Sequence, residues 1–151
     1  MRALIQRVKW AKVLVEHTIV GEIKHGLLIL LGIKKGDSES ETTALAKKIS
    51  EIRIFADAND LMNLSVFDVG GSCLVVSQFT LYADTKRGRR PFFKEAEMPN
   101  VASQLCEQFC ETLRARGIYV ATGVFGAMMQ VESCNDGPVT IWLDTAENKK
   151  K

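Results

Sequence analysis

Short apolar segments rich in β-branched residues crowd the first 33 positions, and they restrict the possible folds more than any other feature of the sequence. Each segment alternates with polar residues or runs apolar for a few positions, which is typical of β-strands. Glycines separate the segments, and the close spacing of the second and third around Glu16 and His17 predicts a hairpin. The expected strands cover residues 3–8, 12–15, 18–23 and 27–33.

Two helices are predicted further along the chain. Ser38 with Glu41 forms a capping box, and apolar residues at helical spacing follow it, which predicts a helix over residues 38–53. A second helix opens at Pro99, repeats apolar residues every four positions and ends near Gly117. Further strands are expected at residues 73–78, 118–122, 128–133 and 139–144. This order of elements predicts an α+β fold with two main helices and a mixed, largely antiparallel sheet.

Size and composition fit one soluble domain. The 151 residues lie near the commonest single-domain size, so we interpret residues 1–151 as one domain that ends in a flexible lysine-rich tail at residues 148–151. The longest apolar stretch, residues 26–33, is far shorter than the ~20 residues that cross a bilayer, so no membrane span is expected. The four cysteines are not densely spaced and no secretory signal is visible. We therefore expect a cytoplasmic protein with reduced thiols.

The common catalytic and metal-binding patterns do not occur in the sequence. His17 and His25 are the two histidines, neither stands at zinc-ligand spacing, and there is no Cys-x-x-Cys. The nucleophile elbow of α/β-hydrolases and the P-loop have no match either. Cys106 and Cys110 lie four residues apart beside the apolar stripe of the second helix, where small buried thiols are the simplest interpretation. We expect neither a metal nor a cofactor.

Three segments could nevertheless carry chemistry. Residues 77–81 end an apolar strand with two hydroxyls and an amide, which can stabilise an oxyanion, hold a ribose or simply cap the next turn. Residues 135–140 read Asn-Asp-Gly-Pro-Val-Thr, so a tight hairpin between two strands is predicted; a cis turn at Gly137 and Pro138 would instead aim backbone carbonyls outward. Residues 86–90 hold four cations. This segment is either a phosphate contact or a solvated charged loop.

Together these residues resemble the D-aminoacyl-tRNA deacylase (D-tyrosyl-tRNA deacylase) family. A Ser-Gln-x-x-Leu pattern begins at Ser77, an Asn-x-Gly-Pro-x-Thr pattern begins at Asn135, and Gln-Arg-Val stands at residues 6–8. Residues 53–55 and 125–129 match the family as well. The resemblance covers nearly the whole chain.

The resemblance implies hydrolysis of the ester that joins a D-amino acid, or glycine, to the terminal ribose of tRNA. It also implies a homodimer with active sites at the subunit interface, because in the family a cis Gly-Pro pair enters the pocket of the neighbouring subunit. This assigns chiral selection to Gly137 and Pro138, and a bracing role to Arg7. Asn135 and Thr140 belong to the same substrate-binding motif.

The same resemblance places the catalytic machinery at residues 77–80. Thr80 stands where a nucleophile has been proposed in the family, but the sequence offers no recognisable histidine or lysine base near it, and an unassisted alcohol is a poor nucleophile. We therefore expect the ribose 2′-hydroxyl to assist instead. By the same resemblance, the adenosine and the scissile ester would be lined by Ser77, Gln78 and the backbone of Phe79. Phe125 and Met129 would lie beside the base.

The sequence departs from the family pattern at residues 59–63, at Arg89 and Phe92 in the basic loop, and at residues 133–134. These positions concern tRNA contact and packing more than the reaction. Two alternatives remain open. One is an editing deacylase for mischarged L-aminoacyl-tRNA, which by resemblance would need a trans Gly-Pro bond. The other is a non-catalytic nucleic-acid binding module that uses residues 86–90 and the lysine tail.

Overall fold

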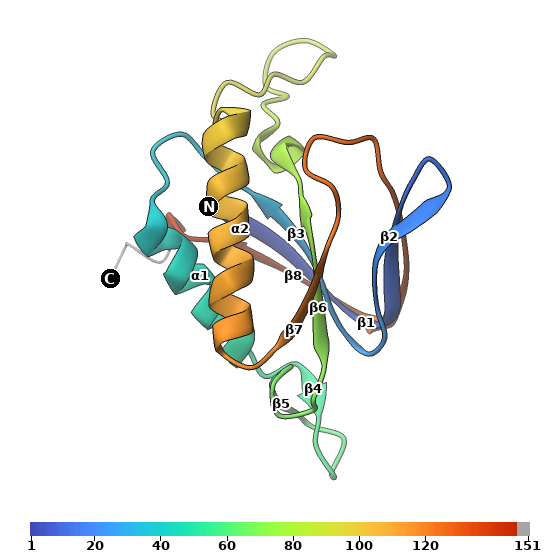
Figure 1. Ribbon diagram of the computed structural model, residues 1–151. Helices are drawn as coiled ribbons and strands as arrows, with labels where there is room; N and C mark the ends of the chain where they lie inside the picture. Colours follow the sequence, from blue (N-terminus) through green and yellow to red (C-terminus); the bar gives the residue numbers. More distant parts are fainter. Residues whose placement is uncertain (148–151) are drawn as a thin grey trace.

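The computed structural model describes residues 1–147, and in that part of the chain a six-stranded mixed sheet packs with two α-helices (Figure 1). This confirms the predicted α+β fold. The tail expected at residues 148–151 lies outside the described residues. No helix within residues 1–147 is long and apolar enough to cross a membrane. The elements are β1 (Arg2–Val15), β2 (Thr18–Ile23), β3 (Gly26–Gly32), α1 (Glu39–Glu51), β4 (Phe55–Ala56), β5 (Met62–Leu64), β6 (Ser72–Ser77), the 3₁₀-helix η1 (Phe79–Tyr82), α2 (Pro99–Ala115), β7 (Tyr119–Thr122) and β8 (Gln130–Asp144).

The long strand β1 organises the sheet. It pairs antiparallel with β3 through its first half, with β2 through its second half, and with β8 along its other edge. The pairs β3–β6 and β6–β7 are parallel. A Cβ atom at Gly21 of β2 would lie 2.2 Å from the carbonyl oxygen of Thr122 in β7, so the two ends of the sheet approach each other and the sheet curls like a barrel.

Both helices cover the same face of this sheet (Figure 1). Leu45 and Ile49 of α1 and Phe109 and Leu113 of α2 are buried there with the apolar residues of the strands, as their helical spacing predicts. A second apolar cluster fills the inside of the curl. It consists of Val8, Ala11, Val13, Ile23, Leu28, Leu74, Val76 and Ala121.

The predicted helix signals are confirmed, with bounds shifted by one or two residues. Ser38 caps α1 and forms the capping box with Glu41. Gly117 follows α2 with a φ of 80°, a left-handed conformation that glycine adopts without steric cost. The predicted β1–β2 hairpin is also present, and both Glu16 and His17 have positive φ as a tight primed turn requires.

The hairpin predicted at residues 135–140 is wrong. β8 runs continuously from Gln130 to Asp144, and its register against β1 shifts where Val8 pairs with Asn135 and Gln6 with Thr140. The turn residues form an irregular bulge inside one strand, because β1 continues to pair with β8 on both sides of it. Turn chemistry alone cannot distinguish a reversal from such a bulge.

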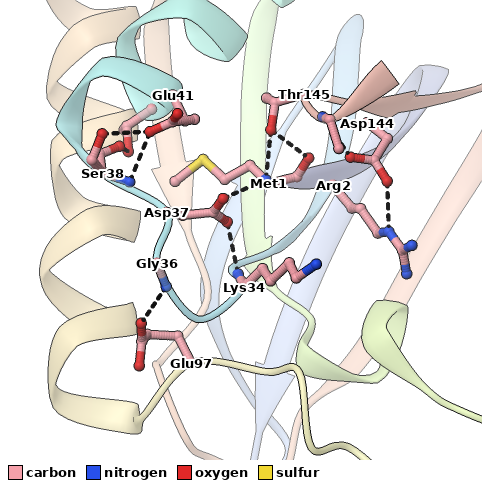
Figure 2. A network of polar contacts seen from close by, with 12 residues as sticks. Met1, Arg2, Lys34, Gly36, Asp37, Ser38, Glu41, Glu97, Asp144 and Thr145 are labelled. Atoms are coloured by element: carbon pink, nitrogen blue, oxygen red, sulfur yellow. Dashed lines mark hydrogen bonds and ion pairs between the residues drawn. The ribbon is translucent and has the colours of Figure 1, made fainter. Parts of the chain in front are cut away.

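The beginning of β1, the loop before α1 and the end of β8 are held together by a polar network (Figure 2). The Met1 amino group donates to Oδ1 of Asp37 at 2.8 Å and to Oγ1 of Thr145 at 2.7 Å. The other Asp37 oxygen accepts the Lys34 N–H at 2.7 Å. These contacts fix the end of the sheet where β1 begins and where β3 and β8 end.

Candidate active site

The first candidate motif lies where β6 ends and η1 begins. The Gln78 N–H donates to the Leu31 carbonyl at 2.7 Å, which continues the pairing of β6 with β3. A Cβ atom at Gly32 would lie 3.1 Å from both the Gln78 carbonyl oxygen and Cβ of Leu81. The glycine therefore lets η1 sit directly on the end of β3.

The side chains of this motif are partly open to solvent. Phe79 is 57% exposed and its ring packs edge-on against Phe93 with centroids 4.9 Å apart. Ser77 and Gln78 are half-buried, Thr80 is exposed, and the Gln78 side-chain amide donates to the Thr80 hydroxyl. The first N–H groups of a helix have no intrahelical acceptor, so the backbone at Phe79 can donate to an oxyanion.

Neither histidine stands beside Thr80. His17 occupies the β1–β2 turn. The His25 ring packs edge-on against Phe55, with centroids 5.1 Å apart, next to the start of β3. The hydroxyl of Thr80 thus lacks the imidazole base that activates an alcohol nucleophile.

A cavity of about 130 Å³ adjoins this motif between α2 and the ends of β6 and β7. It brings Ser77 together with Phe125, which lies 48 residues later in the loop between β7 and β8 and is 39% exposed. Met129 is half-buried and packs against the inner apolar cluster, and a Cβ atom at Gly123 would lie 2.6 Å from its sulfur. The cavity is lined by Val75, Ser77, Ser103, Cys106, Glu107, Cys110, Thr122, Gly123 and Phe125.

The second candidate motif is the bulge in β8. The Gly137-Pro138 peptide bond is cis, both residues are exposed, and Gly137 has a φ of 134°. Arg7 of β1 contacts the backbone of the bulge. Its Nε donates to the Asp136 carbonyl at 3.0 Å, and its Nη1 donates to the Ile54 carbonyl at 2.6 Å. Arg7 thus links the backbone of the bulge to the segment that follows α1.

Asn135 and Thr140 close the bulge across its base. Oδ1 of Asn135 accepts the Val139 N–H at 3.0 Å, and its Nδ2 donates to Oγ1 of Thr140 at 3.0 Å. Gln6 also donates to this Thr140 hydroxyl, at 3.1 Å. Both side chains are thus used to shape the bulge, a role the motif spacing alone does not reveal.

The two motifs lie apart within one chain. Ser77 pairs with Leu31, which pairs with Ala3, whereas Asn135 pairs with Val8. Thr140 at the other end of the bulge pairs with Gln6, so three to five residues of β1 separate the two levels, a distance of about 10–17 Å along the strand. In addition, β8 and β3 lie on opposite edges of β1. The structure therefore brings Ser77 to Phe125 but does not bring Gly137 and Pro138 to Ser77 in the same chain.

The basic loop follows η1 directly. Its base is closed by Asp84 and Phe92, which exchange backbone hydrogen bonds of 2.7 and 3.0 Å. The cations between them, Lys86, Arg87, Arg89 and Arg90, are all exposed. They stand near the first motif, where a polyanion entering the site could meet them.

Arg2 is a residue near the first motif that the sequence analysis missed. Its Nη1 donates to the Leu81 carbonyl of η1 at 2.9 Å, and its guanidinium lies 4.4 Å from the centroid of the Tyr82 ring. Its Nε donates to Asp144 at 2.9 Å. Burial raises the pKa of the Asp144 carboxyl, but the hydrogen bond and charge of Arg2 outweigh it, so this pKa lies below its ordinary value. No local sequence signal reports these long-range contacts.

Two larger depressions, of about 650 and 590 Å³, contain none of the predicted site residues. Within residues 1–147, no group of three or more histidine, cysteine, aspartate or glutamate side chains is arranged to hold a metal ion. The fold and the two motifs therefore define an α+β protein whose candidate site consists of backbone groups and neutral polar side chains.

Comparison with known proteins places this chain in a family. The family model for D-Tyr-tRNA(Tyr) deacylase matches residues 4–144. A D-aminoacyl-tRNA deacylase of Chloroflexus aurantiacus is 57% identical over 147 residues, covering 97% of this chain and 92% of the relative. The chain belongs to the D-Tyr-tRNA(Tyr) deacylase family.

Solved structures agree on the fold. A c-Myc DNA unwinding element binding protein is 37% identical, with a TM-score of 0.90, and the match covers 96% of this chain and 99% of that one. A probable eukaryotic D-amino acid tRNA deacylase, 17% identical, has a TM-score of 0.80 over 94% of this chain and 97% of its own, and shares the fold.

Proposed function

We propose that this protein hydrolyses D-aminoacyl-tRNA, and glycyl-tRNA, at a site completed by two copies of the chain. As a family member the chain is a D-aminoacyl-tRNA deacylase, a hydrolase of the ester between amino acid and tRNA. The observation that carries the proposal is the pair of solvent-accessible motifs, one at Ser77 to Thr80 and one at the cis Gly137-Pro138 bond, on that family's fold.

The homodimer is proposed because one chain keeps these motifs about 10–17 Å apart along β1 and on opposite sides of that strand. The bulge also projects from β8, whose one edge pairs with β1 while no strand among residues 1–147 pairs with its other edge. The unpaired N–H and C=O groups along an open strand edge can form hydrogen bonds with another chain. A twofold dimer would set Gly137 and Pro138 of each copy into the site of the other.

Chiral selection is assigned to the bulge. Arg7 and Asn135 fix its backbone through hydrogen bonds, so its outward carbonyls would hold the α-amino group of the substrate in one position. The space beside Pro138 would then admit a D side chain or the hydrogen of glycine, whereas an L side chain would collide with the backbone. This selectivity rests on steric exclusion rather than on additional attraction.

The chemical step is assigned to positioning and to oxyanion stabilisation. The Phe79 N–H would donate to the oxygen that gains charge, while Ser77 and Gln78 hold the terminal adenosine, with Phe125 and Met129 beside the base. Thr80 is held by the Gln78 amide and has no adjacent histidine. The vicinal 2′-hydroxyl of the ribose would therefore assist the attacking water.

Two other activities predict different outcomes. An editing deacylase for L-aminoacyl-tRNA would cleave L substrates, and a nucleic-acid binding module would bind tRNA through residues 86–90 without cleaving it. The test is to measure turnover of D-tyrosyl-tRNA, glycyl-tRNA and L-tyrosyl-tRNA by the purified protein. We expect cleavage of the first two and an intact third. Equal rates on D- and L-tyrosyl-tRNA, or binding without release of amino acid, would refute the proposal.

A further inference from the structure

Arg2 of β1 stands beside the glycine that lets η1 sit against the sheet. Arg2 pairs with Gly32 of β3, and paired residues on neighbouring antiparallel strands direct their side chains to the same face. A Cβ atom at Gly32 would lie 3.1 Å from Cβ of Leu81 and 3.3 Å from Cε2 of Tyr82, so η1 occupies the space of the missing side chain. The side chain of Arg2 therefore reaches η1 across the glycine.

The guanidinium of Arg2 contacts η1 in two ways. Its Nη1 donates to the Leu81 carbonyl at 2.9 Å. Its Cζ lies 4.4 Å from the centroid of the Tyr82 ring, a distance at which a cation is attracted to the ring face. The Tyr82 hydroxyl is buried and has no hydrogen-bond partner among residues 1–147. The Tyr82 ring is thus held by packing and by the guanidinium rather than through its hydroxyl.

Arg2 is itself fixed in place by Asp144. This residue of β8 pairs with Arg2 on the other edge of β1, and its Oδ2 accepts a hydrogen bond from Nε of Arg2 at 2.9 Å (Figure 2). Its Oδ1 accepts the Ala146 N–H at 2.9 Å, so both carboxylate oxygens are bound. The side chains of Arg2 and Asp144 are 29% and 10% exposed, so water screens this ion pair less than a pair at the open surface.

The 3₁₀-helix η1 is a single short turn with few hydrogen bonds of its own. The Leu81 N–H donates to the Gln78 carbonyl at 3.3 Å. The Ala83 N–H donates to the Thr80 carbonyl at 3.0 Å. Bonds of this kind have poorer geometry than those of an α-helix. The direction of the turn therefore depends on the groups that contact it from outside.

We propose that Arg2 is a positioning residue of the deacylase site, which holds η1 through the Leu81 carbonyl and so sets the direction of the Phe79 N–H. The inference rests on the proposed function for its effect on turnover, whereas its effect on η1 follows from the contacts of Arg2. Phe79 and Leu81 belong to one turn, so a shift of the Leu81 carbonyl also moves the Phe79 N–H away from the oxygen it would stabilise. A displacement on the order of 1 Å in an active site lowers the rate by up to about a hundredfold.

The experiment compares Arg2→Lys and Arg2→Met with a matched control, Arg116→Met. Lysine keeps the charge of Arg2 but lacks the planar fork that reaches two acceptors at once. Arg116 also bridges two acceptors, Ser50 and Glu51, and its side chain is 36% exposed. It follows the end of α2 and lines a depression that contains none of the predicted site residues. Urea denaturation verifies that each variant is folded under the assay conditions.

Single-turnover rates, with enzyme in excess over D-tyrosyl-tRNA, separate the chemical step from binding. We expect a rate about tenfold lower for Arg2→Lys, about tenfold to a hundredfold lower for Arg2→Met, and the parent rate for Arg116→Met. The KM should stay within about twofold of the parent value, because the cations at residues 86–90 are retained. Parent rates in folded Arg2 variants would show a merely structural role, and a raised KM at unchanged kcat would show that Arg2 binds RNA directly. Either result overturns the proposal.

Asp144→Asn tests whether Asp144 acts through Arg2. We expect this variant to slow the single-turnover rate less than Arg2→Met does. The double variant should be no slower than Arg2→Met, because effects that act through one group are not additive. Fully additive losses would overturn the coupling of Asp144 to η1 through Arg2.

Hydrogen exchange of the backbone amides over residues 78–83, followed by mass spectrometry, measures the order of η1 without substrate. Exchange should be faster in both Arg2 variants than in the parent and unchanged in Arg116→Met, because loss of an outside contact makes local opening easier. Identical exchange in the Arg2 variants and the parent would overturn the positioning role. A parent protein that leaves D-tyrosyl-tRNA intact would refute the proposed function, while the exchange data would still decide whether Arg2 holds η1.

Discussion

Arg7 on β1 donates to the carbonyl of Asp136 at 3.0 Å and so supports the peptide that precedes Gly137. Its second contact, to the Ile54 carbonyl at 2.6 Å, ties the bulge to the segment that follows α1. One guanidinium therefore fixes the bulge of β8 relative to the body of the fold. Lysine carries the same charge but lacks the planar fork that reaches two acceptors at once.

Arg7→Lys should therefore reduce both activity and stability. We expect D-tyrosyl-tRNA turnover to fall by about tenfold or more, and the free energy of unfolding to fall by about 1–3 kcal/mol because a carbonyl loses its charged donor. Urea denaturation and turnover measurements test this. Arg114→Lys is the control, since Arg114 lies at the surface of α2 with 37% of its side chain exposed and pairs with Glu107 and Glu111. A variant at Arg7 that behaves like this control would contradict the bracing role.

Gly137→Ala should damage the bulge even though it adds only one methyl group. The new Cβ would lie 2.9 Å from Cγ2 of Val139 and 3.1 Å from Nη2 of Arg7, at a backbone φ of 134°. We expect turnover to fall by about tenfold or more as the carbonyls move. Gly70→Ala is the matched control, because Gly70 also has a positive φ but its Cβ would meet no atom within 4 Å. Equal turnover in both variants would show that the geometry of the bulge is unimportant.

The sequence predicts the regular elements well because local signals determine them. The capping box at Ser38 and the glycine after α2 are local features, and both helices form where these signals indicate. The role of residues 135–140 as a bulge could not be predicted, because it depends on pairing with β1, more than 120 residues away. Arg2 and Cys106 were missed as neighbours of the candidate site for the same reason: only the fold brings them to η1 and to Ser77.

Thr80→Ala should retain most deacylase activity. Its hydroxyl accepts a hydrogen bond from Gln78 and has no imidazole beside it, so its loss removes no activated nucleophile. A tRNA that ends in 2′-deoxyadenosine and carries the amino acid on the 3′-oxygen should react far more slowly. Single-turnover rates with both substrates provide the measurement. An inactive Thr80→Ala protein that occurs together with normal cleavage of the deoxy substrate would restore Thr80 as the nucleophile.

Asp144 should contribute to stability above about pH 4 and lose that contribution in acid. Its pKa in the folded protein lies below the ordinary value of 3.8, so the folded state binds fewer protons there than the unfolded chain. The contribution is complete above the unfolded value and disappears as pH falls through the folded one. Asp144→Asn should flatten the acid limb of a plot of unfolding free energy against pH, measured in urea between pH 7 and pH 2. If the acid limb of Asp144→Asn is identical to that of the parent, the assignment is contradicted. Glu22→Gln, at an exposed position, is the control.

In the proposed dimer, each site takes residues 77–80 from one chain and Gly137-Pro138 from its partner. Mixing a Gly137→Ala chain with a Gln78→Ala chain, after unfolding and joint refolding, tests it directly. If each substitution alone abolishes turnover, random pairing gives mixed dimers with one intact site, and about a quarter of the parent activity should return. A mixture of Gly137→Ala with a chain that carries both substitutions should stay inactive. If the first mixture also stays inactive although mixed dimers form, the site lies within a single chain and the account is wrong.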